Sequence, residues 1–524
     1  MPIKPLKILV WNANGLGRRV LELKQFINSQ NIDIILISET HFTSSSHVNI
    51  PNYDLFITNH PSGRGHGGTA ILIKKSFKCI EQQPYQSVHI QATNIQITDQ
   101  SGQVTISAIY CPPRHIITTE QFRVFLKSLG NRYLLGGDFN AKHVQWGSRI
   151  TNKKGKNLLS AIIAQKSCHL STGEPTYWPS DLRKTPDLID FCIFKNLQKE
   201  TLKIHPCFDL SSDHSPIIVE ISTELLPQDQ PVYNRHTNWT TYRKQIESKI
   251  FLNVSLKTEE EIEKSIIHFN DIVIEAAINS TPLIKNSHQA YTPHHIKMKI
   301  REKRKARKDW QRTRHPVHKA NLNKATVELK NLLAEYEDSK TRTRLSNLSA
   351  NASSNFSLWK ATKCLTKQTT HNPPLKNPDG SWSKTNTERA EVLAKYLENV
   401  FSDSHIRNVA LPSVNQSNQI AHLQNFNCKE IQDCILRRIK NNKSPGYDLV
   451  NKNILVELPL VAVVYIRNLF NSLLRLKYFP KVWKVAQIIA IPKPGKDTTE
   501  PSSYRPILSK VFETLFIARL HPII

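Results

Sequence analysis

Short apolar runs recur along the first part of the chain, and turn residues or polar clusters separate them. The runs read KILVW, IDIILIS, GTAILI, QVTISAIY, RYLLGG, DLIDFCIF and SPIIVEI. Runs of this length that are bounded by turn residues are typical of buried β-strands. Residues 20–29, 119–129 and 157–166 show helical patterns instead. Strands alternating with helices predict an α/β domain over residues 1–222, with its active site at a sheet edge.

The pattern becomes helical and polar over residues 223–425. Residues 297–319 hold eleven Lys or Arg residues against only Glu302 and Asp309. A solvated helix face is the ordinary explanation for a single charge run. The run also predicts a sequence-independent grip on phosphates, with Arg304 and Arg307 as DNA contacts. We therefore expect a basic, mainly helical linker that carries no catalytic groups.

The remaining segment, residues 426–524, combines predicted helices with short apolar stretches. Residues 429–440 and 465–476 have helical patterns, and the stretch FPKVWKVAQIIAIPKPGKD follows them. At 524 residues the chain is long enough for more than one domain. With 39% hydrophobic and 22% charged residues, it has the composition of folded domains rather than of a disordered chain.

The charge of the chain indicates an anionic partner. The formal net charge is +28, and such a surplus repels itself unless a polyanion or counterions neutralise it. Nucleic acid is the favoured partner, although composition alone also allows a basic solvated surface or a membrane-surface protein.

Cysteine usage and the N-terminal sequence bear on the compartment. The eight cysteines form no C-x-x-C pair, so they signal neither a zinc module nor a disulfide framework. The start MPIKPLKILVWN lacks the apolar segment of a signal peptide, and no window approaches 18 consecutive apolar residues. We expect a nuclear or cytoplasmic protein without membrane partners.

Metal-dependent phosphodiester cleavage needs oxygen ligands for a hard cation, a base for water and donors for the phosphate. Asn12 follows the first apolar run in VWNANG, and Glu39 ends the second in SETHF. Their oxygens are expected to project from strand ends into one cleft as Mg²⁺ ligands. Either residue taken alone is more often an ordinary surface position.

A second polar cluster follows the run RYLLGG. In LLGGDFNAKH, two glycines precede Asp138 and Asn140. The glycines are expected to let the backbone turn sharply, so that the carboxylate and the amide face the same way at positions i and i+2. This pair can hold both a water molecule and a phosphate. The alternative is an Asx-turn that caps a strand.

The third cluster contains a histidine between carboxylates. SSDHSPI holds Asp213 and His214, and DLID holds Asp190. An imidazole oriented by a carboxylate is the usual arrangement for moving a proton near neutral pH. His214 is the predicted general base and Asp190 its orienting partner. One histidine among 21 is more often incidental, so the order of the motifs decides in its favour.

The ordered motifs WNANGL, SETHF, IYCPP, GGDFNAKH, DLID and SSDHSPI resemble those of the endonuclease/exonuclease/phosphatase superfamily. The resemblance is closest to the apurinic-like endonucleases of jockey-type non-LTR retrotransposons. It implies a four-layered α/β sandwich with two packed sheets. It also implies one-metal cleavage of DNA that leaves a 3′-hydroxyl and a 5′-phosphate, with Mg²⁺ or alternatively Mn²⁺ as the cofactor.

The resemblance assigns roles to residues near the metal and the phosphate. Asn12 and Glu39 match the family's metal-proximal pair, and Asp213 completes the expected metal set. Tyr110, in IYCPP, matches the tyrosine that contacts the phosphate. Asn14, in the first motif, is expected to contact DNA.

Further roles concern the water and the proton. Asp138 and Asn140 match the residues that align the nucleophilic water. Asp190 and His214 belong, with Asp213, to the family's terminal set of two acids and a histidine. Thr176, in GEPTYW, falls where relatives keep a threonine near the DNA. All of these residues are predicted to meet around one metal ion.

The C-terminal part resembles the beginning of the reverse transcriptase of the same elements. Residues 443–449 (KSPGYDL) and 491–496 (IPKPGK) match its fingers, and residues 504–506 (YRP) match the strand that meets the nucleotide. Lys493 and Arg505 are expected to be vestigial triphosphate contacts. A short internal deletion is expected after YRP. The sequence has no Asp-Asp pair and ends before the palm motifs, so we expect an incomplete polymerase that is inactive alone.

These expectations combine into one functional hypothesis. The chain is predicted to be an endonuclease that nicks target DNA and so provides a 3′-hydroxyl primer for target-primed reverse transcription. DNA is the expected substrate, and element RNA a further expected partner. The alternatives are a catalytically idle nucleic-acid binder, a host abasic-site endonuclease and a phosphatase of the same superfamily.

Overall fold

The structure is a computed structural model. It describes residues 5–227, 231–282, 292–348, 357–366, 373–383, 385–401, 424–438, 446, 448–485, 488–493 and 496–507. The chain forms two compact units. The first unit combines residues 1–228 with 287–392, and the second combines residues 229–286 with 393–524. The segment 223–425, expected as a linker, therefore contributes to both units.

The first sheet of the first unit has six strands in the order β12-β13-β1-β2-β4-β3. The central strands β1 and β2 run parallel, and β13 pairs with β1 antiparallel. The strands are β1 (Leu6–Asn12), β2 (Ile34–Ser38), β3 (Tyr53–Thr58), β4 (Thr69–Lys74), β12 (Leu202–Pro206) and β13 (Ile217–Ile221).

The second sheet has seven strands, six of them in the order β10-β11-β9-β8-β7-β5, with β6 paired to β7. Strands β8 and β9 run parallel, whereas β11 pairs with β9 antiparallel. The strands are β5 (Cys79–Glu81), β6 (Tyr85–Gln86), β7 (Gln91–Asp99), β8 (Gly102–Tyr110), β9 (Tyr133–Asp138), β10 (Cys168–Leu170) and β11 (Asp190–Lys195).

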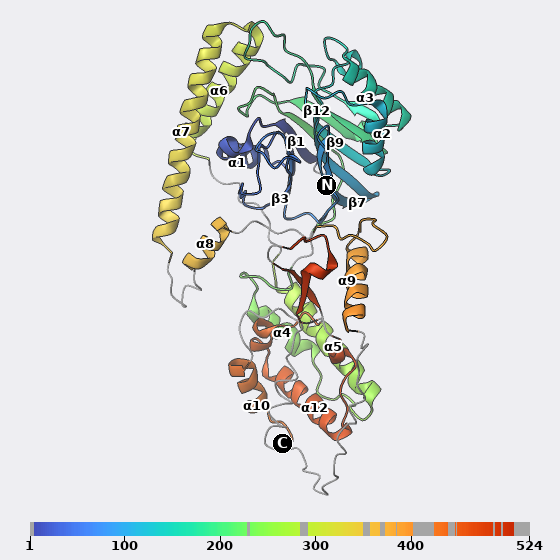
Figure 1. The fold of residues 1–524 in the computed structure, drawn as a ribbon. Helices are drawn as coiled ribbons and strands as arrows, with labels where there is room; N and C mark the ends of the chain where they lie inside the picture. The colour runs from blue at the N-terminus through green and yellow to red at the C-terminus, as the bar shows by residue number, and fades with distance from the viewer. Residues whose placement is uncertain are drawn as a thin grey trace. The chain divides into compact units, whose positions relative to one another are not determined.

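The two sheets pack face to face, with helices outside each (Figure 1). The layer between the sheets is apolar and includes Val10, Leu36, Ile106 and Leu134. Helix α1 (Val20–Gln30) covers the first sheet, while α2 (Thr119–Ser128) and α3 (Lys153–Ala164) cover the second. These four layers confirm the predicted α/β sandwich.

Several strands escaped the sequence analysis. Strand β7 reads QATNIQITD, in which polar and apolar residues alternate, and β3 reads YDLFIT. The runs chosen as strands were continuous apolar segments, whereas alternating strands carry a weaker signal. The two glycines of LLGGDFNAKH were expected to permit a sharp turn, but Gly136 and Gly137 lie inside β9. That explanation was wrong, and their actual function is to allow close packing.

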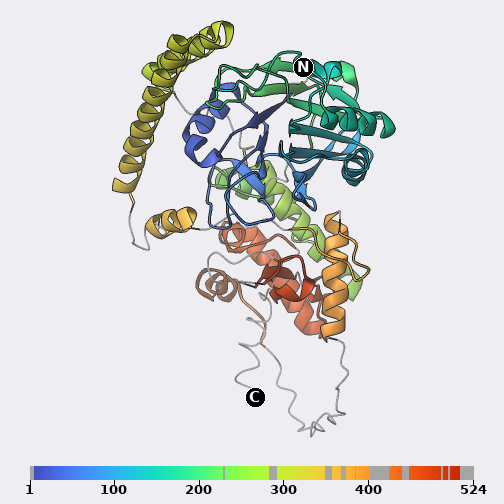
Figure 2. The same cartoon turned by 45° about the horizontal axis from the view of Figure 1, so that its top comes forward.

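Two long helices complete the first unit. Helix α6 (His294–Thr313) and helix α7 (Pro316–Ser346) lie side by side and are yellow in Figures 1 and 2. Pro316 opens α7 at its first position, where a missing N–H costs nothing. Leu329 and Leu333 of α7 pack with Ile296 of α6 and Leu21 of α1. The expected linker thus supplies a helical pair that packs onto the sandwich.

The second unit is mainly helical. Its described helices include α4 (Trp239–Lys249), α5 (Glu259–Asn279), α10 (Cys428–Asp433), α11 (Lys452–Val456) and α12 (Leu460–Leu476). Tyr242, Ile262 and Leu469 are among its buried core residues. The predicted helix at 465–476 corresponds to α12. The predicted helix at 429–440 corresponds to α10 and a following π-helical turn, Cys434–Arg438, while residues 439–440 lie outside the described residues.

The two remaining described helices are α8 (Ser357–Thr366) and α9 (Asn386–Phe401). No helix within the described ranges is both long and apolar enough to cross a membrane.

The motifs IPKPGK and YRP fall at a small hairpin. Strand β14 (Ile489–Pro492) pairs antiparallel with β15 (Tyr504–Ile507). Lys493 follows β14, and its Nζ donates to the carbonyl of Ser502 at 2.7 Å. The Arg505 side chain and most of residues 443–449 lie outside the described part of the chain. The triphosphate contacts remain predictions.

Candidate active site

The ends of β1 and β2 deliver the first two predicted residues. Asn12 is the last residue of β1, and its register partner in β2 is Ser38. Glu39 follows directly and has a left-handed backbone, with φ of 53°. Asn12 is fully buried, and its Nδ2 donates to Oε1 of Glu39 at 2.9 Å. The predicted pairing of these two residues is therefore present in the structure.

The same level of the second sheet carries Tyr110, Asp138 and Asp190. Asp138, at the end of β9, lies opposite Tyr110 of β8 and Asp190 of β11 in the strand registers. Asn12 reaches across from the first sheet, and its Nδ2 donates to Oδ2 of Asp138 at 2.9 Å. One amide thus links carboxylates from both sheets.

Gly137 explains how the two sheets come so close at this point. A Cβ atom at this position would lie 2.0 Å from the carbonyl oxygen of Ile109 and 2.9 Å from Oγ of Ser38. The Ser38 hydroxyl itself donates to that carbonyl at 2.7 Å. The backbone N–H of Asp138 donates to Oγ of Ser38 at 3.2 Å. Only glycine leaves room for this crossing, which sets the position of Asp138.

Asn140 holds the Asp138 carboxylate from the other side. Its backbone N–H donates to Oδ1 of Asp138 at 2.8 Å, and its Nδ2 donates to Oδ2 at 3.0 Å. The first bond is that of an Asx-turn. The turn that was the alternative prediction is therefore present, and it also holds the Asp138 carboxylate within the site. The Nδ2 also donates to the carbonyl of Cys111 at 3.2 Å. Both carboxylate oxygens of Asp138 therefore have donors.

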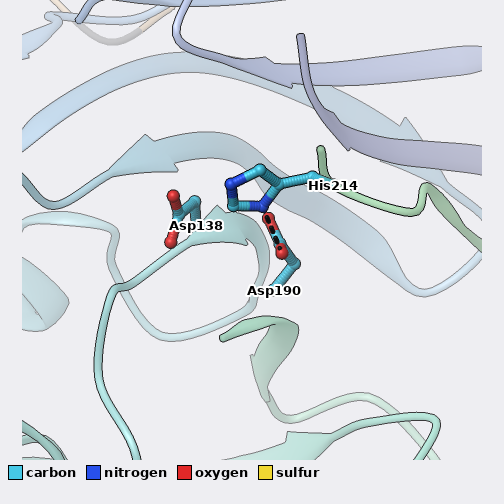
Figure 3. Close-up of side chains that lie close together, drawn as sticks. All are labelled: Asp138, Asp190 and His214. Atoms are coloured by element: carbon cyan, nitrogen blue, oxygen red, sulfur yellow. Dashed lines mark hydrogen bonds and ion pairs between the residues drawn. The ribbon is translucent and has the colours of Figure 1, made fainter. Parts of the chain in front are cut away.

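His214 and Asp190 form a buried pair. Nδ1 of His214 lies 2.8 Å from Oδ2 of Asp190, and the two residues are 4% and 1% exposed. Figure 3 shows Asp138 on the other side of the imidazole ring from Asp190. Ligand atoms of these three residues lie within 4.8 Å of one another. The Tyr177 ring lies 4.9 Å from the imidazole, between ring centroids.

Burial and charge shift the pKa values in this group. Burial raises the pKa of Asp138, and the negative charge of Asp190 raises it further. Burial alone would lower the pKa of His214, but the ion pair with Asp190 outweighs it and raises the pKa. Asp138 and His214 therefore bind protons more tightly than isolated side chains of the same kind do.

Glu39 and Asp213 form the more open end of the site. Nδ2 of Asn14 donates to Oδ1 of Asp213 at 3.1 Å, and Asn14 is exposed. Nε2 of His41 lies 3.2 Å from Oε2 of Glu39, whose side chain is 20% exposed. Burial would raise the pKa of Glu39, but hydrogen bonds from His41 and Asn12 outweigh it and lower the pKa. This end thus presents an ionised carboxylate to solvent.

Tyr110 lies close to both ends. It is 8% exposed, and burial raises the pKa of its phenol, as do Glu39 and Asp138. A phenol that stays protonated keeps a donor available. This property suits the predicted phosphate contact.

The loop that carries Asp213 and His214 is held by α6. Arg307 donates to the carbonyl oxygens of Leu210, Ser212 and His214, the last two at 3.1 and 3.0 Å. Arg307 is 2% exposed. A buried guanidinium bonded to the backbone has no face left for a phosphate. This arrangement disagrees with the DNA contact predicted for Arg307.

Arg304 and Thr176 are also engaged within the protein. Arg304 pairs with Oδ1 of Asp209 at 2.6 Å. Thr176 is 1% exposed, and its hydroxyl accepts the N–H groups of Ile189 and Asp190 at 3.2 and 3.0 Å. Thr176 therefore places Asp190, and its burial disagrees with the predicted DNA contact. Arg304 keeps some exposure, but part of its charge is already neutralised.

His41 and Tyr177 were not predicted from the sequence as parts of the site, and Arg307 was predicted only as a DNA contact. His41 stands inside SETHF and Tyr177 inside GEPTYW, so both lie beside residues that were chosen. Their proximity in sequence was the available signal. For Arg307, about 90 residues from His214, the sequence offered no such signal.

The donor set fits a hard divalent cation. Four carboxylates meet in this site beside the imidazoles of His41 and His214; they are those of Glu39, Asp138, Asp190 and Asp213. Carboxylate and amide oxygens are the ligands that Mg²⁺ prefers. His214 already bonds to Asp190, so its imidazole suits proton transfer better than magnesium binding. The excess negative charge in the site favours a bound cation.

A known protein family matches the first part of the chain, and proteins of mobile elements match nearly all of it. Residues 9–214 match the model of the Endonuclease/Exonuclease/phosphatase family. The chain is 33% identical over 533 residues to the probable RNA-directed DNA polymerase from transposon X-element of Drosophila melanogaster, covering 98% of this chain and 59% of that protein. It is 31% identical to the RNA-directed DNA polymerase from mobile element jockey of Drosophila funebris, covering 98% of this chain and 58% of that protein. The chain thus spans less than two thirds of these relatives.

A solved structure also matches the first part of the chain. The endonuclease domain of TRAS1, a telomere-specific non-LTR retrotransposon, is 21% identical. The match covers 41% of this chain and 98% of that domain, with a TM-score of 0.36.

Proposed function

We propose that the first unit is a Mg²⁺-dependent DNA endonuclease. Residues 9–214 match the Endonuclease/Exonuclease/phosphatase family, and the chain is similar to proteins of the X-element transposon and the mobile element jockey. It nicks target DNA and leaves a 3′-hydroxyl that primes target-primed reverse transcription.

One observation carries this proposal. The Asn12 side chain bonds to Glu39 and to Asp138 at 2.9 Å each, and Asp138 is held in turn by Asn140. Asn12 and Asp138 are 126 residues apart in sequence. Chance motif matches in sequence would not bring these side chains into one hydrogen-bonded group.

The proton-handling roles follow from the buried end. His214 bonds to Asp190 through Nδ1, and the Nε2 of its deprotonated ring takes a proton from the attacking water. Asp190 fixes the ring orientation and stabilises the imidazolium that results. Asp138 and Asn140 align the water through the oxygen atoms of their side chains. Tyr110 donates its hydroxyl hydrogen to a phosphate oxygen.

The open end is the proposed cation site. Glu39 and Asp213 would hold Mg²⁺, or alternatively Mn²⁺, with Asn12 beside them. When bound, the ion supplies positive charge for the negative phosphate in the transition state. Asn12 also orients Glu39 through the hydrogen bond described above.

Plasmid nicking tests the proposal. Purified full-length chain with Mg²⁺ should convert supercoiled plasmid to nicked circles, and EDTA should stop the reaction. An Asp138→Ala variant should bind the plasmid without nicking it. If the wild-type chain binds DNA but forms no nicked circles with either metal, it is the idle nucleic-acid binder and the enzyme proposal is lost.

The products and the substrate preference distinguish related enzymes. A DNA polymerase should extend the nicked ends directly if they carry a 3′-hydroxyl. Oligonucleotide duplexes with and without an abasic site should be cut at similar rates. A strong preference for the lesion would instead identify an abasic-site repair enzyme.

We further propose that these 524 residues do not polymerise DNA by themselves, because the sequence holds no adjacent Asp pair for a two-metal site. Extension of a DNA primer on an RNA template by the purified chain would contradict this. The chain is expected to reach nuclear DNA after cytoplasmic synthesis and to contact element RNA. Imaging of a tagged chain and crosslinking to RNA test these two points.

A further inference from the structure

Helix α6 has two faces with different surroundings. Lys303, Arg307 and Gln311 recur every four residues and are 1%, 2% and 8% exposed. Arg301, which precedes this row, and Lys305 and Lys308, which lie within it in the sequence, are exposed. A four-residue spacing places side chains on one helix face. The basic run is therefore divided into an inward row and an outward row.

The inward row holds the loop 209–215, which carries Asp213 and His214. Lys303 donates to the carbonyl of Asp209 and to Glu22, and Arg307 donates to three carbonyls as described above. Gln311 donates to Oγ of Ser215 at 3.0 Å. Two of the carbonyls that Arg307 bonds, those of Ser212 and His214, flank Asp213 in the chain.

Helix α1 and the turn before it hold the same loop from another side. Glu22 accepts the N–H and the hydroxyl of Ser211, both at 3.0 Å. Arg19 donates to the carbonyl of Ser211. The loop is therefore fixed between α1 and α6. Removal of the α6 contacts should free the imidazole to move relative to Asp138.

The outward row borders a hollow of about 740 Å³ on the first unit. Its lining holds five cationic side chains, two aromatic rings and two acids: Arg301, Arg304, Lys305, Lys308, Arg312, Trp178, Phe208, Glu174 and Asp309. Lys308 lies over the Phe208 ring at 4.9 Å. Trp178 follows Tyr177, whose ring contacts His214. The backbone N–H of Trp178 also donates to the carbonyl of Asp213 at 2.7 Å, so one wall of the hollow adjoins the loop 209–215.

Cations that track a backbone, together with rings on which bases stack, are typical of single-stranded nucleic-acid binding. We propose that α6 belongs to the nuclease itself: Arg307 is a positioning residue for the Asp213–His214 loop, and the outward row with Trp178 and Phe208 binds a single-stranded segment of the DNA. This inference rests on the proposed endonuclease function.

The first test concerns Arg307 in the full-length chain. Arg307→Met should lower kcat about 10-fold or more, the scale on which positioning groups act, and should change the pH profile of kcat. The affinity for a fluorescent single strand should stay within twofold of wild type. An unchanged kcat and pH profile would overturn the positioning role.

A milder variant covers loss of folding. Gln311→Leu removes one contact to the loop, at Ser215, and should lower kcat less than Arg307→Met does. Circular dichroism and thermal unfolding establish that each variant is folded. If Arg307→Met does not fold, an unchanged kcat in a folded Gln311→Leu variant overturns the positioning role.

The second test concerns the outward row. A triple variant, Arg301→Gln, Lys305→Gln and Lys308→Gln, should weaken binding of a fluorescent oligo(dT) and raise KM while kcat is retained. The slope of log affinity against log salt should fall by about 2, because about 0.7 counterions are released per phosphate of a single strand.

A charge-matched control separates a site from general attraction. Lys195, Lys199 and Lys203 lie at and beyond the end of β11 opposite to Asp190. The corresponding triple Gln variant should change the oligo(dT) affinity far less. Equal losses for both triples would overturn the binding site. A larger loss for duplex than for oligo(dT) would overturn the single-strand assignment.

The tests also distinguish this inference from the proposed function. Oligo(dT) binding does not need cleavage, so the outward-row test has a result even if the wild type nicks nothing. If the wild type nicks plasmid while Arg307→Met nicks it equally well, only the positioning role fails.

Discussion

The two ends of the candidate site differ in their access to solvent. The buried end comprises Asp138, Asp190 and His214, which are 0%, 1% and 4% exposed. The open end comprises Glu39 and Asp213, which are partly exposed and accompanied by Asn14 and His41. Asn12 joins the ends through its bonds to Glu39 and Asp138.

This difference teaches how one site separates two kinds of chemistry. In the buried end, low solvent access strengthens the charge interactions, and the pKa values of Asp138 and His214 are raised. In the open end, an ionised carboxylate can bind a cation in place of water molecules. Variants at the two ends should therefore respond differently to added metal.

The largest effect is expected at the buried end. His214→Asn should lower kcat for plasmid nicking by about 10²- to 10⁴-fold, because it removes the proposed general base. Excess Mg²⁺ should not restore the rate. His205→Asn, at an exposed position of β12, is the matched control and should leave kcat unchanged. If added Mg²⁺ restored the nicking rate of the His214→Asn variant, the two ends would not have separate roles.

The next effect is expected at the open end. Glu39→Gln should raise the half-saturating Mg²⁺ concentration at least 10-fold, since losses of 10- to 100-fold follow removal even of groups that only support a metal ligand. High Mg²⁺ should restore part of the rate. Glu224→Gln, whose carboxylate accepts a hydrogen bond from Nε2 of Gln100 at 2.9 Å, serves as the control. Loss of rate without any change in metal dependence would count against a cation at Glu39.

Protonation at the buried end predicts a smaller effect, on stability. The pKa values of Asp138 and His214 are raised above their ordinary values of 3.8 and 6.5. The folded chain therefore binds protons more tightly than the unfolded chain, so each group contributes stability below its ordinary pKa that is lost as pH rises through the raised pKa.

Metal-free protein should accordingly lose thermal stability as pH rises above 6.5. Each kcal/mol lost should lower Tm by about 1–2 °C in a unit of this size. Mg²⁺ should reduce the loss by compensating the carboxylates. Scanning calorimetry in EDTA and in Mg²⁺ over this pH range measures the effect, and a rise of Tm with pH in EDTA would contradict it.

The smallest effect is expected from His41→Asn. It removes the 3.2 Å contact with Glu39 and should raise the half-saturating Mg²⁺ concentration by about 10-fold or less. The maximal rate should be retained at high metal. A loss of maximal rate similar to that of His214→Asn would place His41 among the groups that handle the proton.

Much of the fold and of the site was predictable, for identifiable reasons. Continuous apolar strands such as β1 and β2 are buried on both faces, and their composition alone marks them. Polar residues at or just after strand ends, such as Asn12, Glu39 and Asp138, can be predicted as site residues, and in the structure these three are joined by hydrogen bonds. Strand β7 was missed because its residues alternate, and Gly137 was misinterpreted because a close approach between sheets leaves no trace in local sequence.

The amino-acid sequence by itself determined the α/β class, the order of the motifs and the kinds of side chain available for chemistry, because these depend on local patterns. Only the tertiary structure decided that Arg307 points inward to the histidine loop while Lys305 stays exposed. Both are cations in one helix, and local sequence cannot tell which face of a helix meets the rest of the protein. That choice depends on the loop 209–215, whose carbonyl groups need donors once they are buried.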